Sequence, residues 1–179
     1  DTPGHVDFST EMERTLQVLD YAILVISGID GIQGHSETIW RLLAHYQIPT
    51  FIFVNKMDNM NANKDGLLKE LKSHLSENCY DFEDLDESFY ENIALNNEAL
   101  LNYYLDHNTL TKDMLIDEIN KRQLFPCFFG SALKMNGIDT FLNGFSDYTR
   151  EKNYSDDFGA RVFKISHDEQ GNKLTHLKI

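Results

Sequence analysis

The 179-residue sequence predicts an α/β fold in which a parallel β-sheet lies between two layers of helices. The main observation is a set of three short apolar runs, which is how strands buried on both faces of a parallel sheet read in sequence. Longer segments with helical periodicity separate these runs. The runs are Tyr21–Ser27, Thr50–Val54 and Phe125–Phe129.

The predicted helices alternate with these strands along the chain. Apolar residues recur at helical spacing in Phe8–Asp20, before the first strand. After a turn at Gly28–Gly34, Ser36 can cap a helix that runs to about Tyr46. A last helix, from Ile138 to about Tyr148, follows the third strand and completes the layer pattern.

A helical insertion is predicted between the second and third strands, at residues 64–122. From Glu77 to Glu118 it carries twelve acidic residues and a single basic one, Lys112. This charge excludes a nucleic-acid contact, which needs clustered lysine and arginine. Two interpretations remain, a solvated acidic surface and a docking surface for a basic protein. The candidate helices are Lys64–Leu75, Glu87–Leu95, Glu98–Leu105 and Thr111–Arg122.

The C-terminal residues predict a β-hairpin. Residues 160–167 and 173–179 alternate in polarity on either side of Gln170-Gly171-Asn172, a sequence suited to a tight turn.

The composition predicts a soluble, cytoplasmic protein. The sequence has 41% hydrophobic residues, enough for one substantial core, but no apolar run long enough to cross a membrane and no signal-peptide pattern. Cys79 and Cys127 lack metal-ligand spacing, so reduced, structural thiols are predicted rather than a disulfide or a metal site.

Three short motifs together predict a guanine-nucleotide pocket. Each is weak alone, but strands lead into the last two, and α/β sheets bind ligands beyond the carboxyl ends of their strands. The motifs are Asp1-Thr2-Pro3-Gly4-His5, Asn55-Lys56-Met57-Asp58 and Gly130-Ser131-Ala132-Leu133.

The second motif carries the chemistry of base selection. A carboxylate at Asp58 can accept hydrogen bonds from both N1–H and the 2-amino group of guanine, whereas adenine presents an acceptor at N1. Such a site rejects the wrong base by roughly 10⁴-fold. Asn55 is expected to hold the loop and approach guanine N7, and the methylenes of Lys56 to cover the base and sugar. The alternative for this motif alone is a polar turn after a strand.

Residues 1–58 and 124–145 resemble the GTPase domain of translational elongation factors, specifically the elongation factor G group and the tetracycline-resistance ribosomal-protection proteins. The resemblance implies a P-loop NTPase-like GTPase domain at 1–150, a linker at 151–158 and the start of a β-barrel domain at 159–179. The family's phosphate-binding run, Gly-x-x-x-x-Gly-Lys-Ser/Thr, does not occur in the sequence. The chain is therefore expected to be an N-terminally truncated fragment, inactive alone, that binds GTP and GDP poorly.

The resemblance also implies roles for the first motif, a GTP-binding segment that includes Thr2 and Pro3. Asp1 is expected near the Mg²⁺ of a bound GTP, holding it through water, and the Gly4 amide is expected to bond the γ-phosphate. His5 is the implied catalytic residue, which orients the attacking water once the ribosome has positioned it.

In the third motif, the resemblance implies that the Ala132 amide donates to guanine O6. Ser131 is expected to brace the loop, and Leu133 to complete it as a GTP-binding residue.

The implied function is a ribosome-associated GTPase. It either moves tRNA and mRNA, as the elongation factor G-like run Ser36–Arg41 suggests, or dislodges tetracycline, as the short insertion suggests. The alternative is a non-catalytic protein-interaction module derived from a GTPase fold. The fragment is also expected to form a homodimer, through the open edge of Tyr21–Ser27 or through the hairpin, unless a helix covers that edge.

Overall fold

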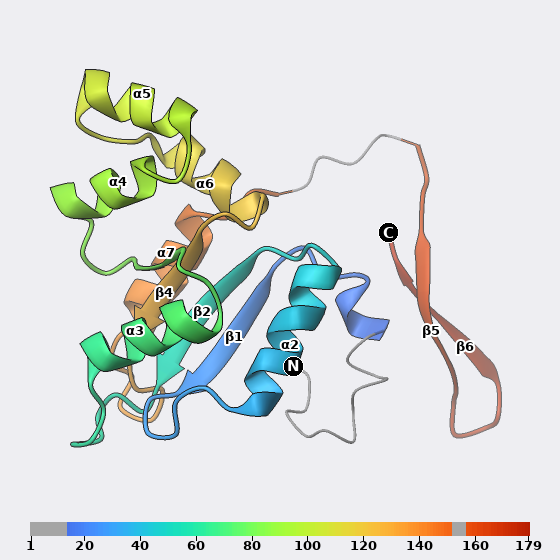
Figure 1. Cartoon of the computed structure of the whole chain (residues 1–179). Coiled ribbons are helices and arrows are strands. Elements are labelled where there is room, and N and C mark those ends of the chain that lie inside the picture. The colour runs from blue at the N-terminus through green and yellow to red at the C-terminus, as the bar shows by residue number, and fades with distance from the viewer. Residues whose placement is uncertain (1–13, 152–156) are drawn as a thin grey trace. The chain divides into compact units, whose positions relative to one another are not determined.

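A computed structural model describes residues 14–151 and 157–179 of the chain. The chain divides into two compact units, one comprising Tyr21–Arg150 and the other Asp1–Asp20 with Glu151–Ile179. The larger unit contains a four-stranded parallel sheet with helices on both faces (Figure 1). The predicted α/β fold is thus confirmed.

The sheet has four strands in the spatial order β1-β2-β4-β3, all parallel. Three of them lie where the apolar runs predicted strands. The fourth, β3, was not predicted, because three residues inside a polar segment are too few to show a periodic pattern. The strands are β1 (Ala22–Ser27), β2 (Thr50–Asn55), β3 (Cys79–Asp81) and β4 (Phe125–Phe129).

Most helices of the larger unit begin at a residue whose side chain caps the first turn. Asn63, Asp86, Asn97 and Thr111 each accept a hydrogen bond from the backbone amide three residues later. The helices are α2 (Gly34–His45), α3 (Lys64–His74), α4 (Glu87–Ala94), α5 (Glu98–His107), α6 (Lys112–Asn120) and α7 (Ile138–Asp147).

The predicted cap at Ser36 was wrong, because Gln33 is the N-cap of α2 and Ser36 lies in its first turn. The helix starts early because the preceding turn is held from outside. Gly31 adopts a φ of 65°, and the amide of Ile32 donates to Glu70 Oε1 at 2.7 Å.

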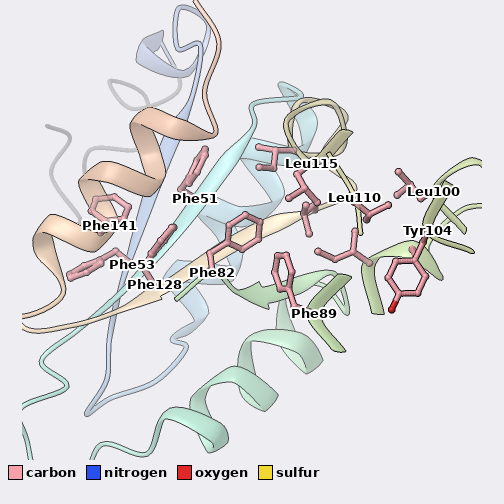
Figure 2. Close-up of a cluster of buried hydrophobic side chains, with 14 residues drawn as sticks. Phe51, Phe53, Phe82, Phe89, Leu100, Tyr104, Leu110, Leu115, Phe128 and Phe141 are labelled. Carbon is pink, nitrogen blue, oxygen red and sulfur yellow. The ribbon is translucent and has the colours of Figure 1, made fainter. Parts of the chain in front are cut away.

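Strand β2 separates two hydrophobic clusters, because successive side chains of a strand point to opposite faces. Ile52 and Val54 belong to the cluster that includes residues of α2 and α3. Phe51 and Phe53 belong to the other, which includes residues of α4, α5, α6 and α7. Figure 2 shows this second cluster extending from the sheet to the insertion. The insertion is therefore part of the core.

Strand β1 differs from the prediction of a strand buried on both faces. Leu24 and Ile26 are 6% and 2% exposed, but Ile23 and Val25 are 44% and 58% exposed. The side of β1 that carries Leu24 and Ile26 packs in the cluster that includes residues of α2 and α3. On the opposite face of the sheet, Phe141 of α7 packs on Phe53 of β2 and Phe128 of β4, and Ile23 and Val25 stay about half exposed.

Arg122 joins the amino-terminal ends of two strands. Its guanidinium lies 4.9 Å from the Trp40 ring and 5.0 Å from the Phe125 ring, and donates to the Ile48 carbonyl and to Thr50 Oγ1. Burial lowers the pKa of Arg122 to about 10, so the side chain stays protonated at neutral pH. Through these hydrogen bonds and cation–π contacts, the Arg122 side chain stabilises the amino-terminal ends of β2 and β4.

The described part of the smaller unit contains the predicted hairpin, with β5 (Arg161–His167) antiparallel to β6 (Lys173–Lys178). Asp168 closes the turn by accepting hydrogen bonds from Asn172 and Gln170, and these bonds lower the pKa of its carboxyl group. Most of the predicted helix at Phe8–Asp20 lies outside the described residues; helical geometry ends at residue 16.

Both cysteines are free and buried. Within residues 14–151 and 157–179, no helix is long and apolar enough to span a bilayer.

Candidate functional site

Strands β1, β2 and β4 end side by side at the carboxyl end of the sheet, and hydrogen bonds join the loops that follow them. The Gly28 amide, after β1, donates to the Asn55 carbonyl at 2.7 Å. The Gly130 amide, after β4, donates to the Val54 carbonyl, and the Met57 amide returns a bond to the Gly130 carbonyl, both at 2.9 Å. The second and third sequence motifs therefore meet at the carboxyl edge of the sheet, where α/β folds bind ligands.

Asn55 is the side chain that joins these two motifs. Its Oδ1 accepts hydrogen bonds from the Lys56 amide at 2.8 Å and from the Ala132 amide at 2.9 Å. One side-chain oxygen thus holds the loop after β2 and also the loop after β4, whose Ala132 lies 77 residues later in the chain. The expectation that Asn55 holds the loop agrees with these two bonds. Its approach to guanine N7 stays a prediction.

Two backbone features allow the loops to come this close. Lys56 adopts a φ of 67°, a conformation that is uncommon without glycine and that often marks functional sites. Gly130 has no room for a side chain, because an added Cβ would lie 2.4 Å from the Asn136 carbonyl oxygen.

Ser131 and Asn136 close the second loop on itself. The Ser131 amide donates to the Asn136 carbonyl at 2.9 Å, and the Asn136 amide donates back to the Ser131 carbonyl at 3.0 Å. Ser131 is 1% exposed, and its Oγ accepts from the Lys134 amide at 3.3 Å. These contacts make the Ser131–Asn136 loop a compact unit of defined shape.

The groups available to a ligand lie on the solvent side of this edge. Asp58 is exposed, and its carboxylate makes no hydrogen bond to any residue in the described ranges. The Leu133 side chain is 87% exposed. The Ala132 amide is already bonded to Asn55 Oδ1, so a guanine O6 at this position has to share that donor or take it over.

The first motif, Asp1 to His5, lies outside the described residues. The expected phosphate, Mg²⁺ and water-positioning roles of this motif therefore have no geometry here. Across the described part of the chain, no group of three or more histidine, cysteine, aspartate or glutamate residues could hold a metal ion.

A hollow of about 230 Å³ lies away from the two loops, between α3, β3 and the start of α4. Tyr80 and Phe89 line it together with the carboxylates of Asp81, Asp84 and Asp86. None of the predicted base-binding residues contributes to its wall.

No sequence pattern singled out Glu83 or Lys64, which the structure places against Phe129, the last residue of β4 before the second loop. The Phe129 amide, just before Gly130, donates to Glu83 Oε1 at 2.9 Å, and Glu83 Oε2 lies 2.6 Å from Lys64 Nζ. In sequence, Glu83 is one of several carboxylates in an acidic run, and nothing distinguishes it from its neighbours.

Comparison with known proteins shows the family to which the chain is similar. The family model described as the elongation factor Tu GTP binding domain matches residues 1–151. The chain is 32% identical to an oxytetracycline resistance protein of Streptomyces rimosus and 31% identical to the tetracycline resistance protein TetP of Clostridium perfringens. Each match covers 100% of this chain and 31% of the relative, so the chain spans about a third of their length.

A crystal structure of a protein from Thermus thermophilus has a similar fold. The TM-score is 0.81 at 19% identity, and the match covers 99% of this chain and 34% of the other.

The geometry predicts that Asn55→Ala separates the two loops. Removing the shared acceptor should speed hydrogen exchange of the Lys56 and Ala132 amides by at least about tenfold, measured by NMR. Asn59→Ala is the matched control, because among the described residues Asn59 Oδ1 bonds only the nearby Asn61 amide, at 3.0 Å. Unchanged exchange at Ala132 in Asn55→Ala would contradict the role assigned to Asn55.

Proposed function

Because the chain belongs to the elongation factor Tu GTP-binding domain family, we propose that it supplies the guanine-recognition half of a translational GTPase. The observation that carries the proposal is the junction at Asn55, where one side chain joins the loop of Asp58 to the loop of Ala132. The names of the two curated relatives support a role in tetracycline resistance. We propose the ribosome, in the cytoplasm, as the partner, which is what the resemblance to translational elongation factors implies.

In the proposed site, Asp58 selects the base. Its exposed carboxylate accepts from the N1–H and 2-amino groups of guanine, and its lack of a described partner leaves both oxygens for this contact. The Asn55 amide group faces guanine N7, and the Lys56 stem covers the base. The Ala132 amide donates to guanine O6, while Ser131 keeps the loop in shape and Leu133 flanks it.

The catalytic half of the proposal concerns the first motif. In this proposal the Gly4 amide bonds the γ-phosphate, and Thr2 and Pro3 form the part of the GTP-binding segment that precedes it. His5 orients the attacking water. When bound, Mg²⁺ neutralises charge on the β- and γ-phosphates, and Asp1 is the residue proposed to hold it through water. These roles rest on the family, because the first motif lies outside the described residues.

Backbone amides and a lysine on the phosphates supply most of the affinity in P-loop sites, and the 179 residues contain no run of the form Gly-x-x-x-x-Gly-Lys-Ser/Thr. We propose that these residues alone bind GTP and GDP weakly and do not turn GTP over.

The base assignment predicts a change of preference in Asp58→Asn of the full-length protein. The new amide can donate to the C2 oxygen of xanthine, so the variant should bind XDP more tightly than GDP, measured by competition with a fluorescent nucleotide. Asp65→Asn removes the same charge from the exposed first turn of α3 and should keep the preference for GDP. Retention of that preference in Asp58→Asn would show that Asp58 does not read the base.

The catalytic assignment predicts that His5→Ala leaves GTP affinity nearly intact and lowers ribosome-stimulated turnover by at least ~10²-fold, as expected for loss of a water-positioning group. Phosphate release with saturating ribosomes measures this. His45→Ala, an exposed histidine at the end of α2, is the control. Normal turnover in His5→Ala would remove His5 from the mechanism.

We also propose a two-fold dimer of the 179-residue chain through β1. Among the described strands, β1 has a single neighbour, β2. The Ala22 and Gly28 amides point to β2, so alternation along the strand turns the backbone groups of Ile23 and Val25 outward. Antiparallel pairing centred on Leu24 then sets Ile23 opposite the partner's Val25, both apolar and about half exposed.

Light scattering over a concentration series tests the dimer, with an expected mass of about twice the 20.7 kDa chain. Val25→Lys places a charge on the exposed side of the edge strand and should return the protein to a monomer. A dimer that persists in Val25→Lys would move the interface to the β5–β6 hairpin. A wild-type monomer at high concentration would end the proposal.

A further inference from the structure

Glu83 connects the acidic insertion to the second base loop. It follows β3 by two residues, and its side chain is 23% exposed. Oε1 accepts the Phe129 amide at 2.9 Å, and Oε2 lies 2.6 Å from Lys64 Nζ. Both carboxylate oxygens are therefore engaged, one by the backbone of β4 and one by α3.

The Glu83 side chain accepts a backbone hydrogen bond from β4 at a position beyond the end of β3. Along β4, the amide of Phe125 donates to the Asn78 carbonyl on the β3 side, at 2.9 Å. Alternation along the strand points the Phe129 amide to the same side. However, β3 ends at Asp81, and Glu83 Oε1 is the acceptor of the Phe129 amide. A carboxylate thus completes the last position of the ladder, immediately before the base loop begins.

Lys64 holds Glu83 in this position. Its Nζ lies 2.6 Å from Asp81 Oδ2 and 2.6 Å from Glu83 Oε2, and 5.0 Å from the centre of the Phe129 ring. Burial lowers the pKa of Lys64, but the hydrogen bonds that Lys64 donates to Asp81 and Glu83 outweigh it and raise the pKa above its ordinary value. The cation is therefore firmly charged at neutral pH.

The two ends of this network lie close in sequence to the two base loops. Lys64 is the first residue of α3, six positions after Asp58. Phe129 is the last residue of β4, three positions before Ala132. On its other flank, the second loop is held by Asn55 through the Ala132 amide. Asn55 thus holds the loop itself, and Glu83 holds the end of the strand that leads into it.

We propose that Glu83, held by Lys64, is a positioning residue that sets the second base loop for contact with guanine O6. The inference rests on the proposed function, because it assigns Glu83 to the same guanine site. A purely structural ion pair would stabilise the fold without altering how the site reads O6.

The test compares GDP with 6-thio-GDP in the full-length protein. The sulfur analogue keeps the N1–H and 2-amino groups read by Asp58 and carries a weaker acceptor at position 6, so the change in the ratio of the two affinities between variants reports the Ala132 contact. Glu83→Ala should weaken GDP binding by about tenfold and bring the ratio close to one. Glu83→Gln should recover most of the loss, because its amide oxygen can still accept from Phe129.

Two further variants separate positioning from stability. Lys64→Met should lower the ratio by about threefold, because it removes the partner of a partly exposed carboxylate and leaves that carboxylate in place. Arg150→Met breaks the pairs with Asp113 and Asp117, none of which belongs to a base loop, and should lower the melting temperature without altering the ratio. Asp84→Ala, an exposed neighbour of Glu83, should change neither quantity.

If Glu83→Ala does not fold, Lys64→Met decides the question, because Glu83→Gln is expected to keep most of the wild-type ratio. A wild-type ratio in every folded variant of Glu83 and Lys64 would overturn the positioning role and leave the guanine site standing. A wild-type protein that binds GDP and 6-thio-GDP equally, together with no effect of Asp58→Asn, would overturn the guanine site itself and this inference with it.

Discussion

The proposed base site depends on the packing of β2, which fixes the position of Asn55 at the end of the strand. Phe51, Ile52, Phe53 and Val54 are between 0% and 4% exposed, because clusters pack on both faces of the strand. A strand held in this way has almost no freedom to shift, so its last residue, Asn55, emerges at a fixed place. A binding group carried on such an element is more precisely placed than one on a free loop.

The insertion belongs to the same packing unit and is not a loose appendage. Phe89 of α4, Leu100 of α5 and Leu115 of α6 lie in one cluster with Phe51 and Phe128 of the sheet (Figure 2). Ion pairs add to this contact, for example Arg150 with Asp113 and Asp117. Exposed pairs contribute about 0–1 kcal/mol each, whereas one buried aromatic or leucine side chain contributes about 2–3 kcal/mol. Apolar packing therefore holds the insertion, and the ion pairs orient it.

The acidic charge of the insertion is unevenly compensated. The pairs that involve Lys64, Lys121 and Arg150 use carboxylates of Asp81–Glu83 and α6. The carboxylates of Glu87, Glu91 and Glu98 on α4 and α5 form no ion pair with a residue of the described ranges. The two interpretations of this surface, solvated helices or a docking site for a basic protein, both fit that distribution.

Sequence reasoning was strongest where one structural rule governs a long segment. The apolar runs located β1, β2 and β4 to within a residue, and Asn63, Asp86, Asn97 and Thr111 cap helices that periodicity had predicted. It failed where tertiary contacts decide. Glu70 binds the turn before α2 and moves its start to Gly34, and β3 exists only because β4 offers an edge to pair with.

The candidate site divides in the same way. The short motifs singled out Asn55, Lys56, Asp58 and Ser131 as candidates because their spacing from strand ends is a local property. The hydrogen bond from Ala132 to Asn55 and the contact of Glu83 with Phe129 join residues 77 and 46 positions apart. No local pattern encodes such pairs. They become visible only when the sheet brings the strand ends together.

A crystal structure of the full-length protein with GDP tests the central claim most directly. The account predicts that both Asp58 carboxylate oxygens lie about 2.6–3.2 Å from N1 and the 2-amino group of guanine. It also predicts that the Ala132 amide faces O6, between Asn55 and the base. A guanine bound away from these two loops, with Asp58 left in solvent, would contradict it.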